Sequence, residues 1–284
     1  MHTARQRSAV LIFLALTFLL AAHRAFAQDS TQVSPPLSHV FAEDVTIALH
    51  DAGSYFSAPF HFSGREWLYT AGAAGGTVLL MSIDRDVKDN VGANTRGTLN
   101  HDFLDIPTRY GVVQYANLFA IATYATGLVV KNDDIRVTGR LMFESLAFSG
   151  VTVIAMRYVA GRSRPYGNNE PWDFRWFETK NEVQSFPSGH TTVAFAFSTV
   201  LAERIDSFWS RLGFYGMASL TAYARVYNHQ HWVSDVVAGA GLGLLSGFHV
   251  VREEERRTAS RPGESSRLQI YPSLTGVEVV YRIN

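Results

Sequence analysis

The segment Phe186-Pro187-Ser188-Gly189-His190 combines the start of a helix with an ionisable side chain. Pro187 stops the preceding structure, Ser188 is a favourable N-cap residue, and Gly189 lets a bound group approach the backbone. The free N–H groups at such a helix start bind phosphate or another oxyanion. His190 stands beside them and exchanges protons near neutral pH. We therefore expect an anion site here; taken alone, the segment has a simpler interpretation as a capped helix with a chance histidine.

A second histidine, His231, is followed four residues later by Asp235. We expect Asn228 to cap a helix that contains both, with His231 in the first turn and both side chains on one face. A carboxylate beside an imidazole fixes the ring's tautomer and leaves the other ring nitrogen to act as a nucleophile or base. The pair therefore indicates a catalytic dyad, and a purely structural His–Asp hydrogen bond is the alternative.

Three arginines lie near these segments in the sequence. Arg157 and Arg164 are seven residues apart and share one helix face if the helix continues to Pro165, which should end it. Arg225 adds a third guanidinium before His231. Guanidinium groups make planar, multidentate contacts with phosphate oxygens. These arginines predict a phosphate cradle, and a solvated or lipid-facing basic helix end is the alternative for the first two.

In order and spacing, the three segments resemble the motifs of the type-2 phosphatidic acid phosphatase and vanadium haloperoxidase superfamily. That family carries Lys-x6-Arg-Pro, then Pro-Ser-Gly-His, then Ser-Arg-x5-His-x3-Asp. This chain differs at two positions, with Arg157 in place of Lys and Ala224 in place of Ser. The first change keeps the charge but alters its shape, and the second removes a minor hydroxyl. The resemblance covers residues 67–251 and favours the membrane-associated bacterial lipid phosphatase branch.

The resemblance implies a phosphatase that needs no metal or other cofactor. By the family pattern, His231 attacks phosphorus to form phosphohistidine, Asp235 orients His231, and His190 protonates the leaving oxygen and then activates water. The implied phosphate-binding residues are Arg157, Arg164, Ser188, Gly189 and Arg225.

The implied substrate is a lipid phosphate or diphosphate of the phosphatidate or undecaprenyl diphosphate type. The sequence does not separate these from phosphatidylglycerol phosphate or lipid A phosphate. A soluble periplasmic acid phosphatase of broad specificity is one alternative. A vanadium-dependent haloperoxidase, with vanadate on His231, is a second, and a membrane scaffold that kept the fold without catalysis is a third.

Composition narrows the class of protein. The chain has 284 residues, of which 47% are hydrophobic and 13% aromatic, and this excludes an intrinsically disordered protein. Lys and Arg number 25 against 25 Asp and Glu, so nothing indicates a nucleic-acid partner. The absence of cysteine excludes disulfides, zinc–thiolate sites and cysteine nucleophiles.

The N-terminal segment 1–27 is typical of a secretory signal peptide. It carries Arg5 and Arg7, then an apolar run, then the small-x-small pattern Ala25-Phe26-Ala27. We expect export to the periplasm, or an inner-membrane protein whose active site faces the periplasm. An uncleaved anchor helix is the alternative.

The rest of the chain predicts an all-α bundle with roughly six core helices. An N-terminal linker and amphipathic segment (28–66) precedes the bundle domain (67–251), which is followed by a charged tether (252–267) and a β-hairpin (268–284). Helices are expected over 41–55, 67–83, 110–130, 137–159, 187–204, 212–226 and 229–251.

Two loops and one glycine pattern complete the expectations. Residues 84–109 are expected to form a charged loop, and 161–185 a polar loop rich in aromatic residues. Gly239, Gly243 and Gly247 predict a small-residue face for close helix packing. Most apolar segments approach the roughly 20 residues that span a bilayer, but several contain polar side chains. The number of true spans is left open.

Overall fold

The computed structural model describes residues 36–94, 101–166, 169–260, 269–273 and 276–280. These residues are mostly helical, which confirms the predicted helical class. The elements are α2 (Leu37–Ser57), the 3-10 helix η2 (Ala58–His61), α3 (Gly64–Met81), α4 (Asp84–Asn94), α5 (His101–Tyr110), α6 (Val113–Val130), α7 (Asp133–Ala160), η3 (Asn181–Val183), α8 (Gly189–Ile205), α9 (Phe208–Tyr227), α10 (Val233–Ala259), β1 (Gln269–Ser273) and β2 (Gly276–Val280).

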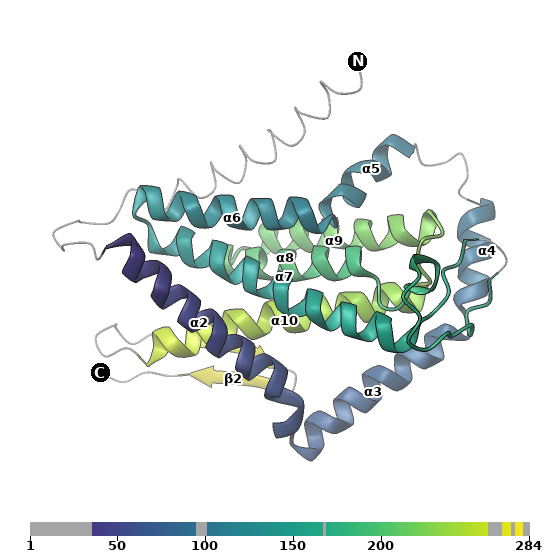
Figure 1. The fold of residues 1–284 in the computed structure, drawn as a ribbon, viewed down its shortest axis with the longest axis horizontal. Helices are drawn as coiled ribbons and strands as arrows, with labels where there is room; N and C mark the ends of the chain where they lie inside the picture. Colours follow the sequence, from purple (N-terminus) through teal and green to yellow (C-terminus); the bar gives the residue numbers. More distant parts are fainter. Residues whose placement is uncertain (1–35, 95–100, 167–168, 261–268, 274–275, 281–284) are drawn as a thin grey trace.

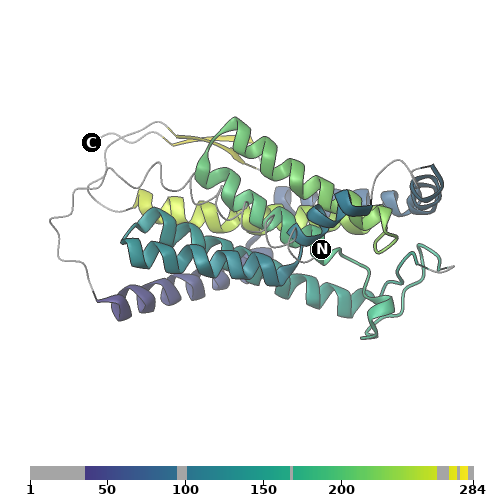
Figure 2. The ribbon, with the colours of Figure 1, turned by 90° about the horizontal axis from the view of Figure 1, so that it is seen from above.

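Helices α6 to α10 lie side by side as a bundle, with α2 across its outside (Figure 1). The buried apolar core is formed by α6, α7, α8 and α10, and includes Leu141, Phe197 and Val250. Figure 1 and Figure 2 both place α4 and the loop between α7 and α8 at the same end of this bundle. The ends of α7 and α9, the starts of α8 and α10 and the loops next to them supply the predicted site residues.

Helices α8 and α10 approach closely along the predicted glycine face. A Cβ added at Gly239 would lie 2.6 Å from the carbonyl oxygen of Ser188, and one at Gly243 would lie 2.5 Å from that of Thr192. A Cβ at Gly247 would lie 2.5 Å from Thr199 Cβ. Real Cβ atoms do not come this close, so the three glycines let α10 pack against the backbone of α8. This prediction is confirmed.

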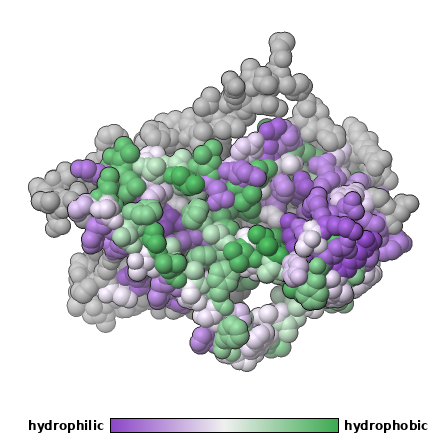
Figure 3. Space-filling view, in the orientation of Figure 1, coloured by the Kyte–Doolittle hydropathy of each residue, from purple (hydrophilic) through white to green (hydrophobic). Residues whose placement is uncertain are grey.

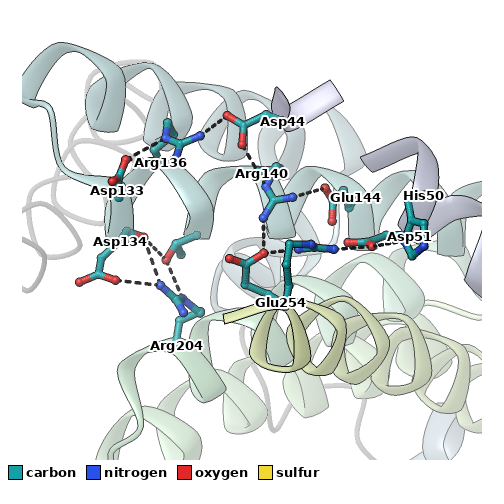
Figure 4. A network of polar contacts seen from close by, with 12 residues as sticks. Asp44, His50, Asp51, Asp133, Asp134, Arg136, Arg140, Glu144, Arg204 and Glu254 are labelled. Carbon is teal, nitrogen blue, oxygen red and sulfur yellow. Dashed lines mark hydrogen bonds and ion pairs between the residues drawn. The ribbon is translucent and has the colours of Figure 1, made fainter. Parts of the chain in front are cut away.

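A network of buried charges attaches α2 to the bundle (Figure 4), and α2 begins at the end of the bundle away from α4 (Figure 1). Asp44 pairs with Arg136 and Arg140 of α7, and Tyr124 donates to Asp44 Oδ2 at 2.8 Å. Asp51 accepts from Arg257 Nη2 of α10 at 2.6 Å. Both aspartates are buried, so these contacts replace the water that the charges lose on folding.

Two predicted segments are wrong. The charged loop expected over 84–109 contains α4 and α5, because the buried carboxylate of Asp84 and apolar residues such as Leu104 give these short helices something to pack with. The charged tether expected from residue 252 continues α10 as far as Ala259. Arg256 pairs with Glu253 and Arg257 with Glu254, three residues apart, and such pairs stabilise a helix.

Three helices in the described parts of the chain are long and apolar enough to cross a membrane: α6, α7 and α10. Figure 3 shows apolar side chains spread across the middle of the bundle, and a dense hydrophilic region at the end that holds α4 and the α7–α8 loop. The molecule therefore has an apolar body and a polar end.

Strands β1 and β2 pair antiparallel, with Gln269 opposite Val280. Nothing is described of their side chains, so the role of segment 268–284 as a cap on the bundle stays a prediction. The predicted signal peptide (1–27) and most of the linker after it lie outside the described residues, as does the tether beyond residue 260.

Candidate active site

The Pro-Ser-Gly-His segment begins α8 as predicted. Ser188 is the N-cap residue and is fully buried, but its hydroxyl accepts from Thr191 Oγ1 rather than from a backbone N–H. The Ser188 N–H donates to the carbonyl of Asp235 at 3.0 Å, which joins the start of α8 to the start of α10. His190 lies in the first turn of α8. The helix start is therefore fixed against α10, with His190 beside it.

His231 precedes α10 instead of lying in its first turn. Asn228 ends α9, and α10 begins only at Val233, so the predicted cap is wrong. The backbone nevertheless turns His231 back toward Asp235, and His231 Nδ1 lies 3.7 Å from Asp235 Oδ2. Both side chains are buried.

The carbonyl of Ser185 fixes the tautomer of His231. His231 Nδ1 lies 2.8 Å from this oxygen, and because a carbonyl only accepts, Nδ1 carries the proton. Nε2 then keeps its lone pair, as a nucleophile requires. At 3.7 Å the Asp235 carboxylate is beyond hydrogen-bond distance. Asp235 therefore acts on His231 through its charge, which differs from the expected direct contact.

The three predicted arginines reach the site from different elements. Arg157, in the last turn of α7, donates from Nε to the Pro187 carbonyl at 3.0 Å, and its Nη2 would lie 2.9 Å from a Cβ at Gly189. Arg164 donates to the backbone carbonyls of Asn181 and Gln230. The expected shared helix face of Arg157 and Arg164 is wrong, because α7 ends at Gly161 in the left-handed region, before Pro165.

Arg225 completes the arginine group from the last turn of α9. It is 8% exposed, and its Nε has no hydrogen-bond partner among the described residues. A buried donor without an acceptor is costly, and an oxyanion held in the site would supply one. Within the described ranges, no three His, Asp or Glu side chains gather in a way that would hold a metal ion.

Burial and positive charge lower the pKa of both histidines. The pKa of His231 falls to about 4, mainly through burial, with Arg164 and Arg157 also lowering it and Asp235 raising it. The pKa of His190 falls to about 3, again mainly through burial and then through Arg225 and His231. Both rings are therefore neutral at pH 7. A phosphate among these groups would raise both pKa values, because its negative charge favours the imidazolium form.

Sequence reasoning missed two buried residues of this site, Arg162 and Asp84. Arg162 donates from Nη1 to Asp235 Oδ1 at 2.6 Å and from Nη2 to Asp84 Oδ2 at 2.7 Å. Asp84 begins α4, in a segment that was expected to form a loop. The only sequence signal for Arg162 is its position between Arg157 and Arg164, within the first motif.

The predicted aromatic loop lies next to the site. Gly161 and Arg175 bond through their backbones, and Arg162 Nε donates to the Pro171 carbonyl at 2.9 Å. Trp172, Trp176 and Phe177 are exposed on the outside of this loop. The loop therefore holds the buried site with its backbone and presents aromatic rings outward.

Two solved structures are similar to part of the chain. A PAP2-type phosphatidylglycerolphosphate phosphatase from Bacillus subtilis aligns with a TM-score of 0.49 and 18% identity over 67% of this chain and 98% of that one. Aquifex aeolicus LpxE aligns with a TM-score of 0.42 and 19% identity over 60% of this chain and 93% of that one.

Curated relatives match about a third of the chain, and a family model matches the part that carries the predicted site residues. A Lipid A 1-phosphatase of Porphyromonas gingivalis is 38% identical over 36% of this chain and 20% of its own length. A Lipid A 1-phosphatase of Rhizobium johnstonii is 31% identical over 37% of this chain and 43% of its own length. The match thus spans less than half of either relative. Residues 138–259 match the family model of the PAP2 superfamily.

Proposed function

We propose that this protein is a membrane-embedded phosphatase that hydrolyses a lipid phosphate through a phosphohistidine on His231. One observation carries the proposal: a buried histidine with its Nδ1 proton held by the Ser185 carbonyl lies among the three guanidiniums of the cradle. That arrangement provides a neutral nucleophile and the positive charge that a phosphate needs. The match to the PAP2 family model and the Lipid A 1-phosphatase relatives support the same function.

In the first step, Arg157, Arg164 and Arg225 hold the phosphate oxygens, with the N–H of Gly189 at the start of α8. The orphaned Nε–H of Arg225 gains an acceptor. His231 Nε2 then forms a bond to phosphorus as the bond to the lipid oxygen breaks. The ring becomes positively charged, and the negative charge of Asp235 stabilises it.

His190 transfers the protons in both steps. Its pKa is low in the free protein, and the charge of the bound phosphate raises it, so that the ring can protonate the leaving lipid oxygen. In the second step, neutral His190 takes a proton from water, which attacks phosphohistidine and frees His231. The guanidiniums supply the positive charge throughout, so we expect the reaction to need no metal or other cofactor.

The apolar body of the molecule supports a lipid substrate. Helices α6, α7 and α10 are long enough to span a bilayer, and the polar end of the bundle carries the site. The exposed rings of Trp172, Trp176 and Phe177 suit the membrane–water interface. We place the protein in the inner membrane, with the site toward the periplasm.

The test is phosphate release from lipid phosphates in detergent micelles with EDTA present. Lipid A, phosphatidate and undecaprenyl diphosphate are compared with a soluble aryl phosphate. We expect the wild type to release phosphate from at least one lipid faster than from the aryl ester, and His231→Gln to be inactive. His61→Gln, which changes an exposed histidine, is the control. Equal activity on the aryl ester would favour the broad-specificity phosphatase, and dependence on added metal would contradict the mechanism.

A further inference from the structure

Arg162 is a fully buried cation that is held between two carboxylates. It is 0% exposed, and its two Nη groups donate to Asp235 on one side and Asp84 on the other. Nη1 also donates to Ser234 Oγ at 2.7 Å, and the rings of Phe174 and Trp232 flank the guanidinium. A guanidinium this enclosed keeps one geometry and one charge.

Asp84 is equally fixed. It is 1% exposed, Oδ1 accepts from the Ser234 N–H at 2.9 Å, and Oδ2 accepts from Ser234 Oγ at 2.6 Å and from Arg162 Nη2 at 2.7 Å. It therefore contacts both the arginine behind Asp235 and the residue that precedes Asp235. Asp84 lies well before residues 138–259, so it comes from outside the matched PAP2 segment.

The summed charge of Asp84, Arg162 and Asp235 determines how strongly Asp235 can stabilise the positively charged form of His231. Arg162 alone would cancel the charge of Asp235, because the pair is neutral. With Asp84 present, the three groups carry one net negative charge. This matters most when His231 becomes positively charged, since charges in a buried site are poorly screened.

We propose that Asp84 is a positioning residue for the proposed phosphatase reaction, and that it acts through Arg162 to leave the negative charge of Asp235 available to phosphorylated His231. This inference rests on the phosphohistidine step of the proposed function. Asp84 touches neither His231 nor the arginines of the phosphate cradle. Its removal should therefore slow the chemical step and leave substrate binding nearly unchanged.

The first test is Asp84→Asn, which keeps the shape and one acceptor oxygen but removes the charge. We expect kcat to fall about tenfold, as for other coupled buried groups, with KM changed less than about twofold. Asp86→Asn is the matched control, because Asp86 lies exposed in the same turn of α4. A KM that rises as much as kcat falls would contradict the proposal.

The second test is the double variant Asp84→Asn/Arg162→Gln. Asp84→Asn leaves the three groups neutral, and Arg162→Gln leaves them with two negative charges. The double variant restores one negative charge and lets glutamine donate to Asp235. We expect its kcat to exceed that of Asp84→Asn by about fivefold. A merely structural role predicts the opposite order, with the double variant the slowest.

A readout that does not need turnover separates this inference from the proposed function. Nitrogen-15 NMR of labelled histidine follows the titration of His231, which lies near Asp235, Arg157, Arg164 and His190, with Arg225 next to His190. Asp84→Asn should lower the pKa of His231 by about one unit, because unopposed Arg162 disfavours the imidazolium, and the double variant should restore it. An unmoved pKa overturns the inference even if the enzyme is active. A shifted pKa in a protein that releases no phosphate would show that Asp84 acts on His231 through Arg162 and would contradict the proposed function.

Discussion

His231 occupies its place because of the backbone around it. The Ser185 carbonyl holds Nδ1, and the turn after α9 brings the ring toward Asp235 without a shared helix. His231 is thus oriented by a backbone carbonyl that no side-chain motif reveals. Arg162 contacts the Asp235 carboxylate, and Asp84 contacts Arg162, so both affect the negative charge next to His231.

Gly189→Ala tests the contact between α8 and Arg157. The added Cβ would lie 2.9 Å from Arg157 Nη2, so the guanidinium must move and the helix need not. We expect kcat/KM for the lipid phosphate to fall about tenfold or more, because small displacements of substrate-holding groups are costly. Thermal stability should be unchanged. Gly216→Ala, where a Cβ meets no atom within 4 Å, should leave kcat/KM at the wild-type value.

The low pKa of His231 predicts how stability depends on pH. The pKa of the His231 imidazole is ~6.5 in the unfolded chain and about 4 in the folded protein. Between these two pKa values the unfolded chain binds more protons than the folded protein. The contribution of His231 to the free energy of unfolding is therefore fully present above pH ~6.5 and is lost as the pH falls toward about 4. The loss from this group is about 3 kcal/mol between pH 7 and pH 4. Thermal unfolding in detergent should show a weaker pH dependence for His231→Gln than for the wild type. Equal dependence in both would refute the buried neutral ring.

The sequence predicted which residues lie near one another better than it predicted their local structure. Motif order and spacing pointed to His190, His231 and the three arginines, which the structure brings together, and their roles stay predictions. Spacing alone failed where a helix ended early, as at Gly161, whose positive φ closes α7 before Arg164. The sequence could not have predicted a part for Asp84 in the site, because that part depends on its contact with Arg162, which lies 78 residues away in the chain.

At the scale of elements, the contact between α8 and α10 sets the geometry of the site. The Ser188 N–H donates to the Asp235 carbonyl, so the start of α8 is held against the residue that carries the Asp235 carboxylate. The three glycines of α10 make this approach possible. Periodicity in the sequence predicted the helix and its glycine face, since both depend on local spacing.

Gly243→Ala should destabilise the protein by about 1–3 kcal/mol, because its Cβ would lie 2.5 Å from the Thr192 carbonyl and 2.7 Å from Phe195 Cβ. Gly241→Ala is the matched control on the same helix, where a Cβ meets no atom within 4 Å. It should be neutral or slightly stabilising, because alanine favours helix over glycine. The unfolding temperatures of the two variants in detergent make the comparison. Equal shifts would contradict close packing of α8 and α10.

In the whole molecule, the two ends of the bundle hold different groups of buried polar residues. One end carries the site, and the other carries the buried charges that attach α2 (Figure 4). The apolar body lies between them (Figure 3). The sequence predicted α2 as an amphipathic helix, but its charged partners on α7 and α10 are distant in the chain and required the structure.

Asp44→Asn should lower stability without affecting catalysis. It leaves Arg136 and Arg140 without their shared carboxylate, and loss of one partner from a buried pair costs about 3 kcal/mol. The variant should unfold at a lower temperature, with a wild-type kcat measured well below that temperature. Asp133→Asn, at an exposed aspartate that also pairs with Arg136, should change neither quantity. A lower kcat for Asp44→Asn would show that the two ends are coupled.

The most direct test of the account is to trap the phosphorylated enzyme. Protein in EDTA is mixed with phosphorus-32-labelled lipid phosphate and quenched in alkali during a single turnover, and the labelled peptide is then identified. We predict label on the peptide that contains His231, in the wild type and in His61→Gln, and none in His231→Gln. Phosphate release without any labelled histidine, or label on another residue, would contradict the mechanism.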